Sequence, residues 1–317
     1  MHLIAAPFTA LDENGKLALE VIEKQAASLV EDLVQGAFVC GSTGEGVLLT
    51  REERMAVASR WCSFAGNELS VIVHVGHASL AEACVLAAHA EQVHASAIAA
   101  VAPFYFRPST VEDLVECCRI IAAAAPRTGF FYYHIPSMTG VDLSMPQFLE
   151  LASAKIPTFQ GIKFTDGNLV EFRRCLEIAG DLHTVHFGRD EVLLPAMTLG
   201  ARSAVGSTYN FAAPVYLRMA DAYARRDLGT ASRLQAVLQG LVRAASARGG
   251  HVALKALSGV YGTPCGPCRM PLGALSPEEL RTLQSRIEEV GFAAELAASR
   301  DWLRADAASQ ASQGVRQ

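Results

Sequence analysis

Lys163 is the residue whose type and surroundings point most directly to chemistry. It lies in the run Phe-Gln-Gly-Ile-Lys-Phe-Thr over residues 159–165, whose apolar composition predicts a buried strand. Burying an ammonium is costly, and desolvation lowers the pKa of a lysine until a neutral amine can attack a carbonyl carbon. The position therefore predicts Schiff-base chemistry. The alternative is a lysine at a strand end whose ammonium reaches solvent.

A second group of residues, Gly41-Ser42-Thr43-Gly44-Glu45, follows another apolar run. The glycines allow a sharp turn, which offers consecutive backbone N–H groups beside the hydroxyls of Ser42 and Thr43. Such a turn can bind an anion, and a carboxylate fits its donors. A turn without a ligand is the alternative. A phosphate loop is disfavoured because the lysine of the GxxxxGK[ST] motif is absent.

A third group, Phe-Phe-Tyr-Tyr-His-Ile-Pro over residues 130–136, ends the predicted strand that precedes the Lys163 strand. Neighbouring strands lie about 4.8 Å apart, so a tyrosine at one strand end can reach a substrate bound to a lysine on the next. Such a phenol can transfer protons. Period-two alternation places Phe131 and Tyr133 on one face, while Phe130 and Tyr132 fit an aromatic core. Alternation alone leaves open which tyrosine acts.

Eight short apolar runs, separated by helical patterns, account for most of the chain. The runs cover Leu3–Phe8, Gly36–Cys40, Val71–Val75, Ala97–Ala102, Phe130–Tyr133, Phe159–Phe164, Thr184–Phe187 and Ser203–Val205. Strands that alternate with helices imply parallel pairing, and eight such units in about 210 residues predict an α/β fold, a closed (β/α)8 TIM barrel, rather than an open sheet. The lysine, the turn and the tyrosines would then share the carboxyl-terminal rim, where such barrels carry function.

Capping boxes mark where several of the helices begin. They are predicted at Thr50–Glu53, Ser79–Glu82, Ser109–Glu112 and Ser276–Glu279. Helical patterns continue beyond the eighth strand, so we expect residues 1–210 to form the barrel and residues 211–295 a C-terminal helical appendage. Residues 296–317, rich in Ala, Ser and Gln, are expected to form a flexible tail.

The composition fits an enzyme that acts on small molecules. The 317 residues are 51% hydrophobic and 19% charged, with a net charge of −5 and a pI near 6.0, and the scattered cations form no basic patch for nucleic acid. The longest apolar stretch, around Ala95–Phe106, is too short to span a membrane. Residues Met1–Pro7 lack the charged region of a signal peptide and lead into a strand, which predicts a cytoplasmic location.

The eight cysteines lie mostly inside apolar segments, which indicates buried side chains rather than a disulfide framework. Cys265 and Cys268 form a CxxC pair flanked by Gly, Thr and Pro before it and by Arg, Met and Pro after it. These neighbours predict a turn-rich loop rather than a redox pair, which requires a flanking strand and helix. The nine histidines form no metal-binding motif, so no metal is predicted.

Four motifs occur in order on the predicted strand ends. They are Gly-Ser-Thr-Gly-Glu, Tyr-Tyr-His-Ile-Pro-x-x-Thr-Gly-Val, Gly-Ile-Lys-Phe-Thr and Val-Gly-Ser-Thr-Tyr-Asn. In these motifs the sequence resembles the dihydrodipicolinate synthase/N-acetylneuraminate lyase family of class I aldolases, over about residues 1–295. The resemblance implies Schiff-base catalysis without a cofactor and assembly as a homotetramer.

The resemblance also assigns roles by position. Lys163 would attack the C2 ketone of a 2-oxo acid, Ser42 and Thr43 would bind its carboxylate, and Tyr133 would transfer protons. Tyr105 matches a tyrosine that reaches the active site of a neighbouring subunit. Carboxylates and hydroxyls suit a polyhydroxy substrate. The residues implied for those contacts are Thr165, Gly188, Asp190, Glu191 and Ser207.

The motifs also bear on the reaction. Tyr-Tyr-His-Ile-Pro and Ile-Pro-Thr-Phe-Gln-Gly are most similar to the sialic acid lyases of the family, which implies cleavage of N-acetylneuraminate to N-acetylmannosamine and pyruvate. The synthases of the family typically carry an arginine that binds a second carboxylate where this chain has Met138, which argues against that activity. Other 2-oxo-acid aldolases or dehydratases are alternatives, as is a non-catalytic binding protein on the same barrel. Arg189 could alter the tolerance for modified substrates or face solvent.

Overall fold

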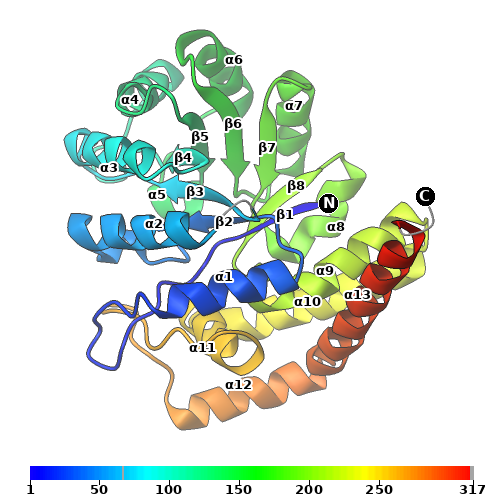
Figure 1. Ribbon diagram of the computed structural model, residues 1–317. Helices are drawn as coiled ribbons and strands as arrows, with labels where there is room; N and C mark the ends of the chain where they lie inside the picture. The colour runs from blue at the N-terminus through cyan, green and yellow to red at the C-terminus, as the bar shows by residue number, and fades with distance from the viewer. Residues whose placement is uncertain (66–67, 315–317) are drawn as a thin grey trace.

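The eight predicted strands are present and pair in sequence order into one closed parallel barrel (Figure 1). They are β1 (His2–Ala5), β2 (Gly36–Val39), β3 (Ser70–His74), β4 (Ala97–Ala100), β5 (Gly129–His134), β6 (Phe159–Phe164), β7 (Thr184–Phe187) and β8 (Ser203–Gly206). Strand β1 pairs with both β2 and β8, which closes the barrel. The computed structural model describes residues 1–65 and 68–314. The predicted (β/α)8 barrel is confirmed.

Helices in the connections between strands surround the barrel (Figure 1). They are α1 (Val21–Glu31), α2 (Arg51–Ala65), α3 (Leu80–Gln92), α4 (Val111–Ala123), α6 (Met145–Lys155), α7 (Leu169–Ala179) and α8 (Leu193–Thr198). The short helix α5 (Pro136–Thr139) and two 3-10 turns, η1 (Gly46–Leu48) and η2 (Asp190–Val192), lie in the loops after β5, β2 and β7. Because every crossover returns the chain to the start of the next strand, the carboxyl ends of all eight strands share one rim.

Side-chain caps fix the starts of several helices. Thr50 Oγ1 accepts from the Glu53 N–H at 3.2 Å, and Glu53 accepts from the Thr50 N–H at 2.9 Å. Ser276 and Glu279 form the same reciprocal box at the start of α12 (Pro277–Glu289). Ser79 caps α3 through its hydroxyl. These three starts lie where the sequence predicted them.

The cap predicted at Ser109 is wrong by one residue. Thr110 caps α4, because its hydroxyl accepts from the Asp113 N–H at 3.1 Å. Thr110 has the extended backbone of an N-cap residue, with φ −127° and ψ 161°. Both residues carry a hydroxyl, so the composition of the segment alone could not choose between them.

Among the described residues, the hydrophobic core includes one cluster inside the barrel, a larger one outside it against the helices, and a small one around Phe8. Phe131 and Tyr133 point into the barrel interior, where they pack with Phe38 and Ile72. Their neighbours Phe130 and Tyr132 belong to the outer layer. The predicted alternation along β5 is therefore confirmed, and it places Tyr133 on the inner face of the barrel.

Within the described residues, five helices follow the last strand. They are α9 (Tyr209–Ala224), α10 (Leu228–Ser246), α11 (His251–Tyr261), α12 and α13 (Phe292–Gly314). Helices α10 to α13 gather on one side of the barrel, next to α1 and α9 (Figure 1). Helix α9 begins at Tyr209 and so crosses the domain boundary expected at residue 210. None of the helices in the described ranges is both long and apolar enough to cross a membrane.

Residues 296–314, within the segment expected to form a flexible tail, belong to helix α13. Leu296 and Leu303 are buried, and Ser299 between them is fully buried as well. Their spacing places all three on one face of α13, which packs against α9. Alanine, which is abundant in this segment, has the highest helix propensity, so a low apolar content was compatible with a helix. Residues 315–317 lie outside the described residues.

Candidate active site

Lys163 lies inside the barrel on β6 with only 5% of its surface exposed. Its Nζ atom is 4.0 Å from the centre of the Tyr133 ring and 4.2 Å from the centre of the Phe38 ring. Within the described ranges Lys163 forms no ion pair with a carboxylate. The amine therefore faces two aromatic rings, which stabilise a cation less than a paired carboxylate would and leave the nitrogen free to react.

Tyr133 and Lys163 are register partners on the adjacent strands β5 and β6. The Tyr133 hydroxyl lies 3.5 Å from Ser42 Oγ, so it faces the turn that follows β2. Its ring makes edge contacts with Phe38 and His74, with centroid distances of 5.4 and 5.9 Å. The structure thus brings together the lysine, the phenol and the serine that the sequence singled out.

The turn after β2 has the tight backbone that its glycines predicted. The Glu45 N–H donates to the Ser42 carbonyl at 3.1 Å, and Glu45 itself adopts φ +54°. A Cβ atom at Gly46 would lie 1.9 Å from the Cys40 carbonyl oxygen, so only glycine fits there. Thr43 is buried, and its Oγ1 lies 2.7 Å from Ser207 Oγ after β8.

His74, at the carboxyl end of β3, is a neighbour of the site that sequence reasoning set aside. The Val101 N–H donates to its Nε2 at 3.3 Å, and its Nδ1 lies 3.1 Å from the Cys40 carbonyl oxygen. Nδ1 therefore carries the proton of a neutral ring. Burial, together with the nearby charges of Arg54 and Lys163, places the pKa of His74 well below its ordinary value. Its position at a strand end was the signal that could have identified it.

Asp190 is buried in the loop after β7 and is fixed by a residue that the sequence did not single out. It accepts hydrogen bonds from the Thr208 N–H at 3.0 Å and from the Thr208 hydroxyl at 2.6 Å. A Cβ at Gly206 would lie 2.0 Å from Asp190 Oδ1, so the glycine makes room for this carboxyl. Burial raises the pKa of Asp190 to about 6, although the hydrogen bonds from Thr208 oppose the rise.

The remaining residues implied for sugar contacts lie at the same rim. Thr165 follows β6, and its hydroxyl occupies the space that a Cβ at Gly188 would need, at 1.9 Å. Glu191 is half-buried and pairs with Arg189 at 2.6 Å, with 26% of the Glu191 side chain and 41% of the Arg189 side chain exposed. Arg189 is therefore an ion-pair partner of a predicted sugar-binding residue rather than a free surface cation.

Tyr105 and Met138 lie on the outside of the molecule. Tyr105, in the loop after β4, is 78% exposed, and its ring packs against that of Phe106, which is 87% exposed. Met138 in α5 is 71% exposed. Two adjacent aromatic rings are thus left exposed at this loop.

Cys265 and Cys268 lie in the loop between α11 and α12, as predicted, and both are buried free thiols. Burial raises the pKa of Cys265 to about 11 and that of Cys268 to about 12. Both thiols are therefore protonated at neutral pH and are poor nucleophiles.

One group of side chains has the composition of a metal site. The ligand atoms of Glu45, His251 and Cys268 lie within 4.8 Å of one another. The ammonium of Lys255 already contacts Glu45 Oε1 at 2.6 Å, so a protein cation occupies the place next to this carboxylate. The donor set does not fit a divalent ion while that lysine is present.

A cavity of about 370 Å³ lies elsewhere, between the end of α1, the end of α11 and α13. Its lining includes Asp32, Tyr261 and Arg300 but none of the predicted site residues. The end of α1 leads into β2, so this cavity is at the opposite end of the barrel from the rim that carries Lys163, Tyr133 and Ser42.

Comparisons with known proteins identify the family to which the chain belongs. Residues 1–290 match the model of the dihydrodipicolinate synthetase family. The chain is 38% identical to the N-acetylneuraminate lyase of Mus musculus over 295 residues, which cover 92% of each protein. The chain therefore belongs to the dihydrodipicolinate synthetase family.

Two solved structures show which members of that family the chain resembles. The N-acetylneuraminate lyase of Proteus mirabilis superposes with a TM-score of 0.89 at 37% identity, covering 92% of this chain and 98% of the other. The sialic acid aldolase of Aliivibrio salmonicida gives a TM-score of 0.89 at 40% identity, covering 92% and 97%. The chain is thus similar along nearly its whole length to enzymes named for cleaving sialic acid.

Proposed function

We propose that this protein is a class I aldolase that reversibly cleaves N-acetylneuraminate to N-acetylmannosamine and pyruvate. The observation that carries the proposal is the buried amine of Lys163, between the rings of Phe38 and Tyr133 and beside the turn that contains Ser42. The names of the relatives support this substrate over others. No cofactor is needed, because a protonated imine supplies the electrophile.

The proposed reaction begins with a Schiff base. The 2-oxo acid places its carboxylate on the hydroxyls and amides of Ser42 and Thr43, and the amine of Lys163 attacks its C2 carbonyl carbon. Water leaves, and the iminium at C2 becomes an electron sink. Tyr133 then passes its phenol proton to the substrate carboxylate and takes the proton of the C4 hydroxyl, the C3–C4 bond breaks, and N-acetylmannosamine departs. The enamine on Lys163 is protonated at C3 and hydrolysed by water to pyruvate and the free amine.

The glycerol-like and acetamido ends of the substrate would bind at the ends of β6, β7 and β8. The residues proposed for these contacts are Thr165, Gly188, Asp190, Glu191 and Ser207. Asp190 and Glu191 differ in their surroundings. Asp190 is buried and accepts a hydrogen bond from Thr208, whereas Glu191 is paired with Arg189. Each retains lone pairs that can accept from sugar hydroxyls.

We also propose a homotetramer that acts in the cytoplasm on these small molecules. Tyr105 would complete the active site of a neighbouring subunit. The exposure of Tyr105 and Phe106, two large rings that a lone subunit leaves in water, supports a subunit contact at this loop.

The synthase activity of the family is the nearest alternative, and one observation opposes it. The side chain at the position of its arginine is Met138, which is exposed and cannot pair with a second carboxylate. The other 2-oxo-acid aldolases and dehydratases of the family would share the Lys163 chemistry and differ in the sugar contacts.

Pyruvate release from N-acetylneuraminate, measured with coupled lactate dehydrogenase, tests the proposal. We expect release by the wild type, none by Lys163→Ala, and full activity of Lys155→Ala, which changes an exposed lysine at the end of α6. Unchanged turnover by Lys163→Ala would refute the Schiff base. A wild type that releases no pyruvate, yet is trapped by borohydride with added pyruvate, would refute the substrate and keep the aldolase chemistry.

A further inference from the structure

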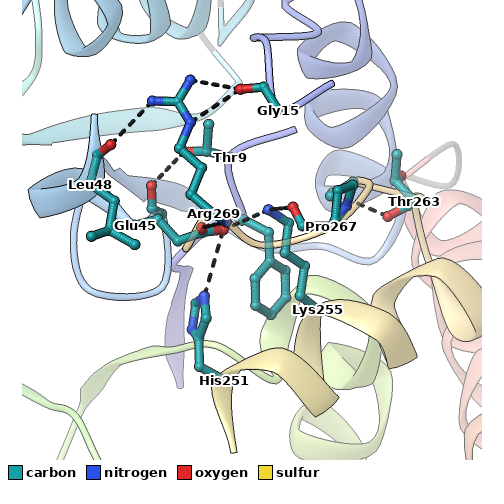
Figure 2. A network of polar contacts seen from close by, with 12 residues as sticks. Thr9, Gly15, Glu45, Leu48, His251, Lys255, Thr263, Pro267 and Arg269 are labelled. Atoms are coloured by element: carbon teal, nitrogen blue, oxygen red, sulfur yellow. Dashed lines mark hydrogen bonds and ion pairs between the residues drawn. The ribbon is translucent and has the colours of Figure 1, made fainter. Parts of the chain in front are cut away.

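Glu45, the last residue of the turn motif, has a fully buried carboxylate that is paired with a residue far away in the sequence. Lys255 Nζ lies 2.6 Å from Glu45 Oε1, with side-chain exposures of 1% for the lysine and 0% for the glutamate. Figure 2 shows Lys255 reaching this carboxylate from α11. The C-terminal helices therefore touch the turn that follows β2 through a buried ion pair.

The same carboxylate is held at its second oxygen. The Arg269 N–H donates to Glu45 Oε2 at 2.8 Å, and Lys255 also donates to the Pro267 carbonyl oxygen at 2.7 Å. The Arg269 guanidinium donates to the carbonyl oxygen of Leu48, just beyond the turn, at 3.1 Å (Figure 2). Residues 255–269 thus contact both the side chain and the backbone of the segment that contains the turn.

The position of the Glu45 carboxylate fixes the backbone of the turn. Glu45 adopts φ +54°, a conformation that is unfavourable for a residue with a side chain. Its N–H donates to the Ser42 carbonyl, and the Gly46 N–H donates to the Gly41 carbonyl, both at 3.1 Å. Because these bonds close the turn around Ser42 and Thr43, a shift of the carboxylate is transmitted to the hydroxyls and amides of those two residues.

Electrostatics keeps the Glu45 carboxylate charged in spite of its burial. Burial alone would raise the pKa of Glu45, but the groups of His251, Lys255 and Arg269 outweigh burial and lower the pKa to about 2. The carboxylate is therefore ionised at neutral pH. Replacing a buried ion pair with apolar residues is often neutral for stability, whereas removing one partner is costly. A pair of this kind is better suited to fixing a geometry than to adding stability.

We propose that Lys255 is a positioning residue for the carboxylate-binding turn, acting on Ser42 and Thr43 through Glu45. The part of this inference that concerns pyruvate rests on the proposed function, whereas the part that concerns the turn does not. The C-terminal segment is then a component of the substrate-binding apparatus, although it contributes no atom to the reaction.

Hydrogen exchange of the turn tests the proposal without any ligand. We expect the peptide that covers residues 41–49 to exchange faster in Lys255→Met than in the wild type. Arg300→Met is the matched control, because it removes a different ion pair between a C-terminal helix and the barrel, the 3.5 Å contact with Asp32. This control should leave the peptide unchanged. Equal exchange in the wild type and Lys255→Met would overturn the proposal.

Borohydride trapping with pyruvate tests the consequence for binding. In Lys255→Met the pyruvate concentration for half-maximal trapping should rise by about ten- to hundredfold, since small displacements at a site have effects of this size. The extent of trapping at saturating pyruvate should stay unchanged. In the reverse reaction, the condensation of pyruvate with N-acetylmannosamine, the half-saturating concentration of N-acetylmannosamine should also stay unchanged. A merely structural role would lower the melting temperature and leave the pyruvate concentration unaltered, which would contradict the proposal.

Two further arms keep the test decisive. If Lys255→Met does not fold, Lys255→Gln takes its place, because its amide can still donate one hydrogen bond without a charge. We then expect effects in the same direction but smaller. If the wild type itself fails to trap pyruvate, the proposed function is refuted, and the exchange of residues 41–49 still decides whether Lys255 positions the turn.

Discussion

Tyr132 and Tyr133 are adjacent in the chain, yet they belong to opposite layers of the protein. Tyr133 faces Lys163 and Ser42, whereas the Tyr132 hydroxyl is buried without a hydrogen-bond partner among the described residues. The two tyrosines therefore allow a controlled test of proton transfer. The same replacement by phenylalanine can be made at Tyr133, which faces Lys163, and at Tyr132, which faces the outer layer and serves as the control.

We expect Tyr133→Phe to lower kcat for N-acetylneuraminate cleavage by about 10²- to 10⁴-fold, the usual contribution of a positioned acid or base. KM should change little, because the phenol acts in the bond-breaking step. Steady-state kinetics of Tyr133→Phe and Tyr132→Phe give the comparison, with Tyr132→Phe expected to match the wild type. A rise in KM alone would mean that Tyr133 only binds substrate.

Asp190 gives a pH dependence with a definite sign. Its folded-state pKa is raised to about 6, above that of an exposed aspartate, so ionisation is less favourable in the folded protein than in the unfolded chain. The stability that its protonated form contributes is present at low pH and is lost as the pH rises through about 6.

We therefore expect Asp190→Asn, which does not ionise, to gain stability relative to the wild type as the pH rises. The difference in unfolding free energy between the two proteins should grow by about 1 kcal/mol from pH 5 to pH 8. Urea unfolding at both pH values measures it. A difference that is constant over this range would show that Asp190 does not carry a raised pKa.

Sequence reasoning at the residue scale succeeded where a residue type was unusual for its place. A lysine inside an apolar run stood out, and Lys163 is buried as predicted. His74 and Thr208 were missed because their importance lies in what they contact. A histidine at a strand end and a threonine after a strand are ordinary in sequence, and only the fold brings one to Tyr133 and the other to Asp190.

At the scale of elements, the position of the residue that caps α4 can be tested by mutation. Thr110→Ala should destabilise the protein by about 1 kcal/mol, because it leaves the Asp113 N–H without its acceptor. Ser109→Ala, at the position that the sequence pattern suggested, should leave stability unchanged. Denaturant midpoints of the two variants decide the matter, and a larger loss for Ser109→Ala would contradict the observed cap.

The strands were predictable because both of their faces are buried, which makes parallel strands read as short apolar runs. Phe159–Phe164 and Thr184–Phe187 coincide with β6 and β7 to the residue. Helix α13 was not predictable on the same grounds. Its buried face consists of few apolar residues, and its stability depends on α9, a contact that local composition does not encode.

At the scale of the whole molecule, the exposed rings of Tyr105 and Phe106 predict assembly. We expect sedimentation equilibrium to give about four times the 33.8 kDa mass of the chain. Replacing Phe106 with Ser should weaken the assembly, while Val170→Ser, at an exposed apolar residue on α7, serves as a comparison. A wild-type protein that sediments as a monomer would refute the tetramer and the role of Tyr105 in a neighbouring site.

The architecture was predictable because eight strand and helix units leave few ways to bury both faces of every strand. The contact between the barrel and its C-terminal segment was not predictable, because nothing in the sequence near Glu45 indicates a partner 210 positions later. Long-range pairs between charged residues have no local signature. Neither the sequence of the turn motif nor that around Lys255 indicates that the other is its partner.

The Glu45 and Lys255 pair also bears on how the protein is made. Every residue proposed to touch substrate lies before residue 208, so a ribosome has synthesised all of them well before it reaches α11. Until Lys255 and Arg269 emerge, the Glu45 carboxylate lacks two of the groups that hold it. A nascent chain can therefore close its barrel, by pairing β8 with β1, and still lack a finished carboxylate site. Catalytic competence would be acquired only after α11 and the loop that follows it have been synthesised.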